Sequence, residues 1–169
     1  MNLTEILGRY AEDARRAPPP EIEHDFDLVA HEAAPDAMQD GIAEAFRSDD
    51  TPPFEEMVAQ LFEHSDPRVR AGLLDNLLAG LGPTAIGRSS GGLAEVWRRY
   101  AAGARVSPDR AANVDPLEVQ EVARQARKQN PGVLERVSRF YARHPELVRT
   151  LGSAAMSIAL SRIARRRAH

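Results

Sequence analysis

The sequence predicts an all-α protein, a compact bundle of about six to eight short helices. Apolar residues recur every three or four positions along most of the chain, as they do on the buried face of an amphipathic helix. Prolines at regular spacing follow side chains that can cap a helix, which marks repeated helix starts. No run of β-branched residues alternates with polar ones, so no segment has the pattern of a strand.

The first third is expected to be the loosest part of the chain. A helix over residues 3–16 is predicted to end at the prolines 18–20, which favour an extended, semi-rigid spacer. Short helices are predicted over residues 25–32 and 35–47. We therefore expect two parts, an acidic helical arm over residues 1–50 and a helical bundle domain over residues 51–169.

Proline-led starts divide the bundle domain into helices. The residue before each proline can accept a hydrogen bond from the amides of the next turn, and the pairs are Thr51-Pro52, Asp66-Pro67, Ser107-Pro108, Asp115-Pro116 and Asn130-Pro131, with His144-Pro145 as a weaker start. Successive prolines in two series lie 14–16 residues apart, which fits one helix and a corner. Residues 82–92, rich in glycine and serine, predict a loop that could act as a hinge between subdomains.

Four predicted helices carry clear apolar faces at helical spacing. Their residues are Phe54, Met57, Val58, Leu61 and Phe62; Val69, Leu73, Leu77 and Leu81; Leu93, Val96, Trp97, Tyr100 and Ala101; and Val133, Leu134, Val137, Phe140 and Tyr141.

The last predicted helix, residues 145–166, is apolar on nearly all sides. Such a helix must be buried, and three interpretations stay open. It could be the central helix of the bundle, pack on the same helix of a second copy, or lie on an anionic membrane surface. It ends in arginines that suit the negative end of a helix and are candidate partner-binding residues: Arg162, Arg165, Arg166 and Arg167.

Charge is distributed unevenly along the chain. The formal net charge is −3, but residues 1–66 carry 17 acidic and 4 basic residues, whereas residues 67–169 carry 8 acidic and 18 basic residues. The two parts could attract each other within one chain or between subunits, or the basic part could bind nucleic acid or another anionic surface. A role in solubility alone is the third interpretation.

Catalytic and metal-binding patterns are weak. The chain has no cysteine, which excludes disulfides, thiol nucleophiles and cysteine-ligated metals. His24, Asp27 and His31 share a predicted helix face, but the two histidines would lie about 10 Å apart along the axis, too far to share one ion, and we interpret them as part of a solvated acidic face. Residues 87–92 could cradle a phosphate but lack the lysine of a P-loop. We expect no enzyme, no metal and no cofactor.

Nucleic-acid binding is the alternative function. A helix over residues 116–129, the corner 129–132 and a helix over residues 131–143 have the shape of a helix-turn-helix. Arg136, Arg139 and Arg143 lie on one side of the second helix and are candidate partner-binding residues. That helix offers no Asn or Gln to read adenine edges.

Residues 69–145 resemble the YidB-like bacterial proteins of unknown function. The resemblance is carried by the segment from Leu73-Leu74 through Leu77-Leu78-Ala79-Gly80-Leu81, by Gly91-Gly92-Leu93, and by Val106-Ser107-Pro108. It implies a bacterial protein with a homeodomain-like helical fold and brings no catalytic residues. Residues 1–66 have no counterpart in the resemblance, and the glycine content is lower.

The sequence therefore favours a non-enzymatic interaction or assembly module. We expect its partner to be another protein or a second copy of the chain, with nucleic acid as the alternative and peripheral contact with an anionic membrane as a third. No run approaches the ~18 apolar residues of a membrane span. The first residues lack the features of a signal peptide, so the expected compartment is the cytoplasm.

Overall fold

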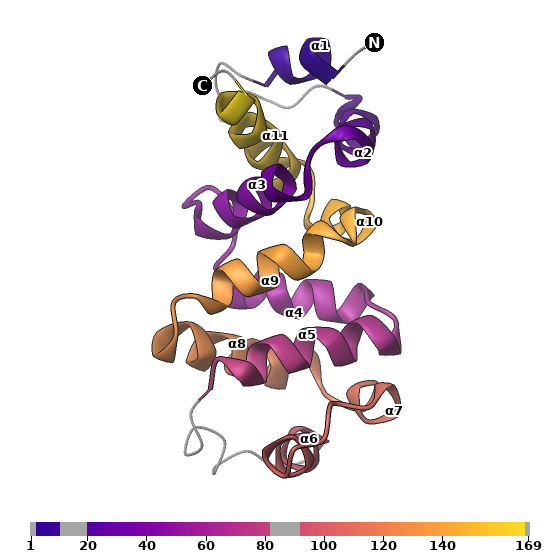
Figure 1. Ribbon diagram of the computed structural model, residues 1–169, viewed down its shortest axis with the longest axis vertical. Coiled ribbons are helices and arrows are strands. Elements are labelled where there is room, and N and C mark those ends of the chain that lie inside the picture. Colours follow the sequence, from indigo (N-terminus) through magenta and orange to yellow (C-terminus); the bar gives the residue numbers. More distant parts are fainter. Residues whose placement is uncertain (1–2, 11–19, 82–91, 168–169) are drawn as a thin grey trace. The chain divides into compact units, whose positions relative to one another are not determined.

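The computed structural model describes residues 3–10, 20–81 and 92–167, and every regular element in these ranges is helical (Figure 1). The all-α prediction is confirmed. The elements are α1 Leu3–Gly8, α2 Ile22–Glu32, α3 Pro35–Arg47, α4 Phe54–His64, α5 Pro67–Ala79, α6 Gly92–Ala101, α7 Pro108–Ala111, α8 Pro116–Gln129, α9 Val133–Ala142, α10 Pro145–Val148, the 3₁₀ helix η1 Arg149–Leu151, and α11 Ser153–Arg167. None of them is long and apolar enough to cross a membrane.

The described helices outnumber the predicted ones because three of them are a single turn long and the last predicted helix is interrupted. Residues 145–166 do not form one helix: α10 ends at Val148 and η1 at Leu151, and α11 begins at Ser153 after Gly152. Gly152 has a φ of +102°, which a helix interior does not allow. The expected end of the first helix near residue 16, the prolines 18 and 19, and residues 82–91 of the hinge loop lie outside the described residues.

The chain forms two compact units whose bounds differ from the expected division at residue 50. Unit 1 comprises residues 1–53 and 138–169, and unit 2 comprises residues 54–137. The acidic first third thus belongs to the same unit as the basic last helix. The physical reason is the apolar surface of α11, which must be covered and is covered by α1, α2 and α3.

The central element of unit 1 is α11. Its residues 155–161 are all buried, so it is covered on more than one side, and α3 is its main neighbour. The approach to α3 is close at Gly41, because a Cβ atom there would lie 2.8 Å from the carbonyl oxygen of Ala159. This packing agrees with the first of the three interpretations, in which the last helix is the central one.

Unit 2 is built on α4, α5 and α8. The predicted face of α4 is entirely buried, and α4 packs mainly against α8. Arg70 of α5 joins the end of α4, since its Nε donates to the carbonyl oxygen of Phe62 at 2.9 Å and its guanidinium lies 4.8 Å from the Phe62 ring centroid. On α6 the predicted face is only partly buried: Val96 is buried and Trp97 and Tyr100 are half-buried, but Ala101 is exposed.

Three of the predicted caps are confirmed. The side chain of Asp66 accepts from the amide of Val69, that of Ser107 from the amide of Arg110, and that of Asp115 from the amide of Leu117. Each cap places a proline at the first position of its helix.

Two of the predicted starts are wrong. Thr51 does not cap the next helix, because its hydroxyl donates to the carbonyl oxygens of Ala45 and Ser48 at the end of α3. The next helix, α4, begins only at Phe54. Asn130 Oδ1 accepts from the amide of Gly132 at 3.1 Å, so Pro131 lies in a turn and α9 begins at Val133.

Candidate functional site

The arginines predicted on α9 are exposed. Arg136 and Arg139 lie on the helix and Arg143 directly after its end, while Val133, Val137 and Tyr141 on the other side are buried. Arg139 Nε lies 3.5 Å from Oε1 of Gln39, a weak hydrogen bond by distance. The predicted helix-turn-helix partner, α8, packs mainly against α4 and α5.

The four arginines predicted near the end of the chain differ in their surroundings. Arg162 and Arg165 are exposed on α11. Arg166 Nη1 donates to Oδ2 of Asp40 at 2.8 Å and to the carbonyl oxygen of Asp36 at 2.9 Å, which links α11 to α3. Arg167 is the last residue of α11, and its side chain lies outside the described part of the structure.

Ion pairs within unit 1 join acidic residues of the first part of the chain to arginines of the last part. Besides Arg166, Arg149 Nη1 donates to Oδ2 of Asp27 at 2.9 Å. Unit 1 as a whole carries 14 acidic and 11 basic residues, and unit 2 carries 11 of each. Each folded unit therefore has a net charge much closer to zero than residues 1–66 or residues 67–169 have.

The side chains of His24, Asp27 and His31 all belong to α2, and both histidines are exposed. The carboxylate of Asp27 is held by Arg149, and Nδ1 of His31 lies 3.0 Å from the Asp27 carbonyl oxygen. Among the residues that the structure describes, no group of three or more His, Asp or Glu side chains could hold a metal ion.

A small pocket in unit 2 gathers three arginines. It has a volume of about 60 Å³ and lies between α6, the segment that follows it, and α7, with the lining residues Val96, Arg99, Ala104, Arg105, Val106, Ser107 and Arg110. Val96 and Val106 are buried, Arg110 is half-buried, and Arg99 and Arg105 are exposed. The pocket therefore has an apolar base, and three arginines are among its lining residues.

The turn after α6 brings two of these arginines together. The amide of Gly103 donates to the carbonyl oxygen of Tyr100 and the amide of Ala104 to that of Arg99, each at 3.0 Å. This pair of bonds is the Schellman arrangement that ends many helices, and it needs a residue of positive φ, here Gly103 at +98°. The chain reverses there, so Arg105 comes to line the same pocket as Arg99.

Two further bonds hold the rest of the pocket in place. Asp75 Oδ1 on α5 accepts from the amide of Val106 at 3.0 Å, which fastens the segment after the turn to the body of unit 2. The Ser107 hydroxyl accepts from the amide of Arg110 at 3.4 Å and so caps α7, the helix that carries Arg110. The backbone that bears the three arginines is thus fixed from both sides.

Arginine side chains of the kind that line this pocket can bind anions. Arginine stays protonated throughout the physiological pH range and presents planar, forked donors that suit carboxylate and phosphate oxygens. Among the described residues Arg105 has no ion pair. The sequence analysis missed this site because its three arginines share no helix face. The Ala102-Gly103 pair, a helix-ending signal, was the local clue.

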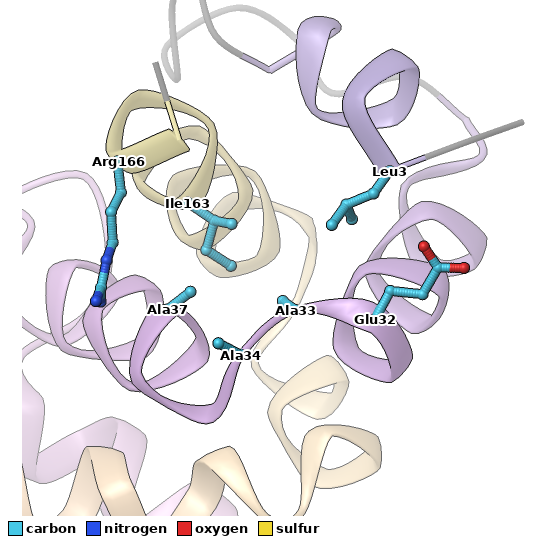
Figure 2. A pocket seen from close by; sticks show the side chains of 7 residues that line it. All are labelled: Leu3, Glu32, Ala33, Ala34, Ala37, Ile163 and Arg166. Carbon is cyan, nitrogen blue, oxygen red and sulfur yellow. The ribbon is translucent and has the colours of Figure 1, made fainter. Parts of the chain in front are cut away.

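A larger pocket of about 250 Å³ lies in unit 1 between α1, the α2–α3 junction and α11. Figure 2 shows Leu3 and Ile163 reaching towards the methyl groups of three alanines, Ala33, Ala34 and Ala37, with Glu32 and Arg166 on opposite sides. Small side chains on α3 and at its start leave this space open. Its walls are mostly apolar.

Unit 1 also contains a buried acidic residue that the sequence did not reveal. Asp25 on α2 is 2% exposed, and its Oδ2 accepts from the Tyr10 hydroxyl at 2.7 Å and from Arg9 Nη1 at 3.3 Å. Burial, followed by the hydrogen bond and the negative charge of Asp25, raises the pKa of Tyr10 above its ordinary value. This cluster fastens the segment after α1 to α2.

Comparisons with known protein families, with curated proteins and with solved structures found no match to this chain.

Proposed function

We propose that the protein is a non-enzymatic helical interaction module that holds an anionic group of a partner in the pocket lined by Arg99, Arg105 and Arg110. The observation that carries this proposal is that three arginines, from α6, the following segment and α7, line one pocket. A partner anion in this pocket would lie close to Arg105, which has no ion pair among the described residues. Charge-assisted hydrogen bonds of this kind are about twice as strong as neutral ones.

The apolar base of the pocket supports the same proposal. Val96 is 1% exposed and Val106 is 8% exposed, so they form a floor with little access to water. Electrostatic attraction is stronger where water is excluded, which here applies to the floor and not to the exposed side chains of Arg99 and Arg105. Because arginine does not exchange its proton near neutral pH, the three side chains suit binding rather than acid–base catalysis.

The test is a titration of the full ¹⁵N-labelled chain with inorganic phosphate, followed by NMR at constant ionic strength. Saturable shifts are expected for the amides of residues 99, 103–107 and 110. The Arg105→Gln variant should weaken binding, whereas Arg98→Gln, on the same helix but outside the pocket lining, should not. Uniform, unsaturable shifts across the chain would refute the proposal.

Nucleic-acid binding through α9 is the second candidate, favoured by the exposure of Arg136, Arg139 and Arg143. Binding through phosphate contacts weakens steeply as salt is raised, with a slope set by the number of contacts. Filter binding of duplex DNA and of single-stranded RNA at several salt concentrations tests this candidate. The double variant Arg136→Gln/Arg139→Gln should make binding less dependent on salt concentration. If the unsubstituted chain binds neither nucleic acid at low salt, this second candidate is excluded.

Self-association and a YidB-like relationship stay predictions. Light scattering after size-exclusion chromatography, at low and high salt, tests the first. A salt-sensitive oligomer would indicate assembly driven by charge.

A further inference from the structure

We infer that the uncovered face of α6 is a docking surface for an acidic amphipathic helix of another protein. This face, here called the α6 surface, consists of Trp97, Tyr100 and Ala101, and Arg105 follows it after the turn that ends the helix. The inference rests on the proposed function, because it names the partner whose anionic groups would lie near Arg105.

Helix α6 is covered only in part. Val96 is buried, whereas Trp97 and Tyr100 are half-buried and Ala101 is exposed. Among the described elements α7 is the main neighbour of α6, and Figure 1 shows it beside α6 at the edge of unit 2. A helix of four residues is about 6 Å long and one of ten residues is about 15 Å long. The single turn of α7 therefore cannot cover α6 along its whole length.

The aromatic side chains of α6 are suited to a protein interface. Trp97, Tyr100 and Ala101 lie at positions i, i+3 and i+4, so they form one ridge on the helix. The rings of Trp97 and Tyr100 stack with centroids 6.0 Å apart, and each ring is thus held by the other before a partner binds. Tryptophan and tyrosine are enriched in protein interfaces and among the residues that contribute most to binding.

A helix is the partner element that fits this ridge. Addition of a partner strand needs an exposed sheet edge, and every regular element within residues 3–10, 20–81 and 92–167 is helical. Two helices pack when side-chain ridges spaced three or four residues apart on one lie in the grooves of the other. A partner helix with apolar residues at positions i, i+3, i+4 and i+7 would therefore cover the α6 surface.

The local charge favours an acidic partner. Residues 92–112 contain four arginines and two acidic residues, so a net charge of +2 remains however these residues pair with one another. Arg105 is exposed and has no ion pair among the described residues. Charges at the rim of an interface act mainly on the association rate and on the choice of partner. Carboxylates beside the apolar face of the partner helix would therefore favour it over a neutral or basic helix.

The charge of unit 2 as a whole disfavours nucleic acid as the partner. Aromatic side chains also occur in sites for single-stranded nucleic acid, but those sites follow the phosphate backbone along a positively charged groove. Unit 2 carries 11 acidic and 11 basic residues, so it has no overall positive charge to attract a polyanion. A partner helix needs the positive charge only beside α6.

The test uses the full chain and a fluorescent peptide of about 14 residues, a usual length for a protein helix. Leucines at every third or fourth position form its apolar face, and glutamates flank them. A twin peptide has glutamine in place of every glutamate, and a third has a proline at its centre, which breaks the helix. Fluorescence anisotropy gives the affinities, and the emission of Trp97, the only tryptophan, reports contact with the α6 surface.

The glutamate peptide is expected to bind roughly tenfold more tightly than the glutamine peptide at low salt. This advantage should shrink as salt is added, because salt screens charges that are exposed. The proline peptide should bind neither the unsubstituted chain nor any variant.

Variants separate the α6 surface from general charge. Arg105→Glu should weaken binding of the glutamate peptide roughly tenfold and leave the glutamine peptide unchanged, because it reverses one exposed charge. Lys128→Glu is the matched control on α8, whose main neighbours are α4 and α5, and should bind both peptides as the unsubstituted chain does. Tyr100→Ala removes one ring and should weaken binding of both peptides roughly tenfold. Far-UV circular dichroism establishes that each variant is folded, and Arg105→Glu tests the inference even if Tyr100→Ala does not fold.

The possible failures are distinguishable. Equal affinity for the glutamate and glutamine peptides would overturn the inference of an acidic partner. Tighter binding of a single-stranded oligonucleotide would overturn it in favour of nucleic acid, and a dimer that Tyr100→Ala dissociates would overturn it in favour of a second copy of the chain. If neither peptide binds but inorganic phosphate still shifts the pocket amides, the inference is wrong and the proposed function stands. If phosphate fails as well, both are wrong.

Discussion

The hydrogen bond between Tyr10 and Asp25 offers the sharpest test of how unit 1 is held together. The Tyr10→Phe substitution removes one oxygen and leaves the ring, which is 4% exposed. The lost bond, 2.7 Å from the hydroxyl to Oδ2 of Asp25, is made to a carboxylate that stays buried. Bonds to charged groups contribute about 1.5–3 kcal/mol each, so we expect the free energy of unfolding to fall by about that amount.

The measurement is urea-induced unfolding followed by far-UV circular dichroism, with Trp97 fluorescence as a separate probe of unit 2. Tyr100→Phe is the matched control. It removes a hydroxyl from a half-buried tyrosine of unit 2, and that hydroxyl makes no hydrogen bond to a described residue. That substitution should change the free energy of unfolding by no more than about 0.5 kcal/mol. If Tyr10→Phe costs no more than Tyr100→Phe, the buried cluster does not stabilise unit 1 as argued.

The same pair gives a pH dependence. The pKa of Tyr10 is raised above its ordinary value of 10.0, so the folded state holds the phenol proton more tightly than the unfolded state does. The resulting stability is fully present below pH 10.0 and is lost as the pH rises towards the pKa of the folded state. The unsubstituted chain should therefore lose more stability than Tyr10→Phe between neutral and strongly alkaline pH. Parallel curves for the two proteins would contradict the assignment.

Three further substitutions test other parts of the fold, each by urea-induced unfolding. Gly103→Ala meets no atom within 4 Å, so its cost of about 1–2 kcal/mol arises from the positive φ alone; it should also weaken phosphate binding, and an unchanged affinity would mean that the turn does not position Arg105. Asp66→Ala should cost about 1 kcal/mol by removing the bond to the Val69 amide, whereas Asp66→Asn should retain most of the stability; equal losses would exclude the cap. Gly41→Val should cost about 1–3 kcal/mol through overpacking against Ala159 and Ile163, and a neutral result would show that α3 and α11 can separate without cost.

Local chemistry made much of the fold predictable. Helix starts at Asp66-Pro67 and Asp115-Pro116 depend on a side chain and an amide two or three residues away, so the sequence contains everything that decides them. Thr51 followed the same pattern, but its hydroxyl reached carbonyl groups at the end of the preceding helix. A cap signal therefore predicts that a side chain will bond to nearby backbone, without deciding which helix it serves.

The sequence did not reveal the Tyr10–Asp25 cluster or the arginine pocket, because tertiary packing creates both. In the sequence Asp25 resembles the other acidic surface residues. Only the fold shows that Tyr10, fifteen positions earlier, bonds to it. Arg99, Arg105 and Arg110 share no helical spacing and come to line one pocket only after the reversal at Gly103. The central position of α11 could be argued from its apolar surface, but the choice among its partners required knowledge of which helices cover it.

The division of unit 1 between the two ends of the chain has a consequence for biosynthesis. Helix α11 leaves the ribosome only after all of residues 54–137 have been made. Unit 2 is continuous in sequence and can complete its core first, whereas α1, α2 and α3 must wait with exposed apolar surface for the helix that covers them. Truncation within α11 would therefore turn the early helices into targets for chaperones and proteases while leaving the core of unit 2 intact.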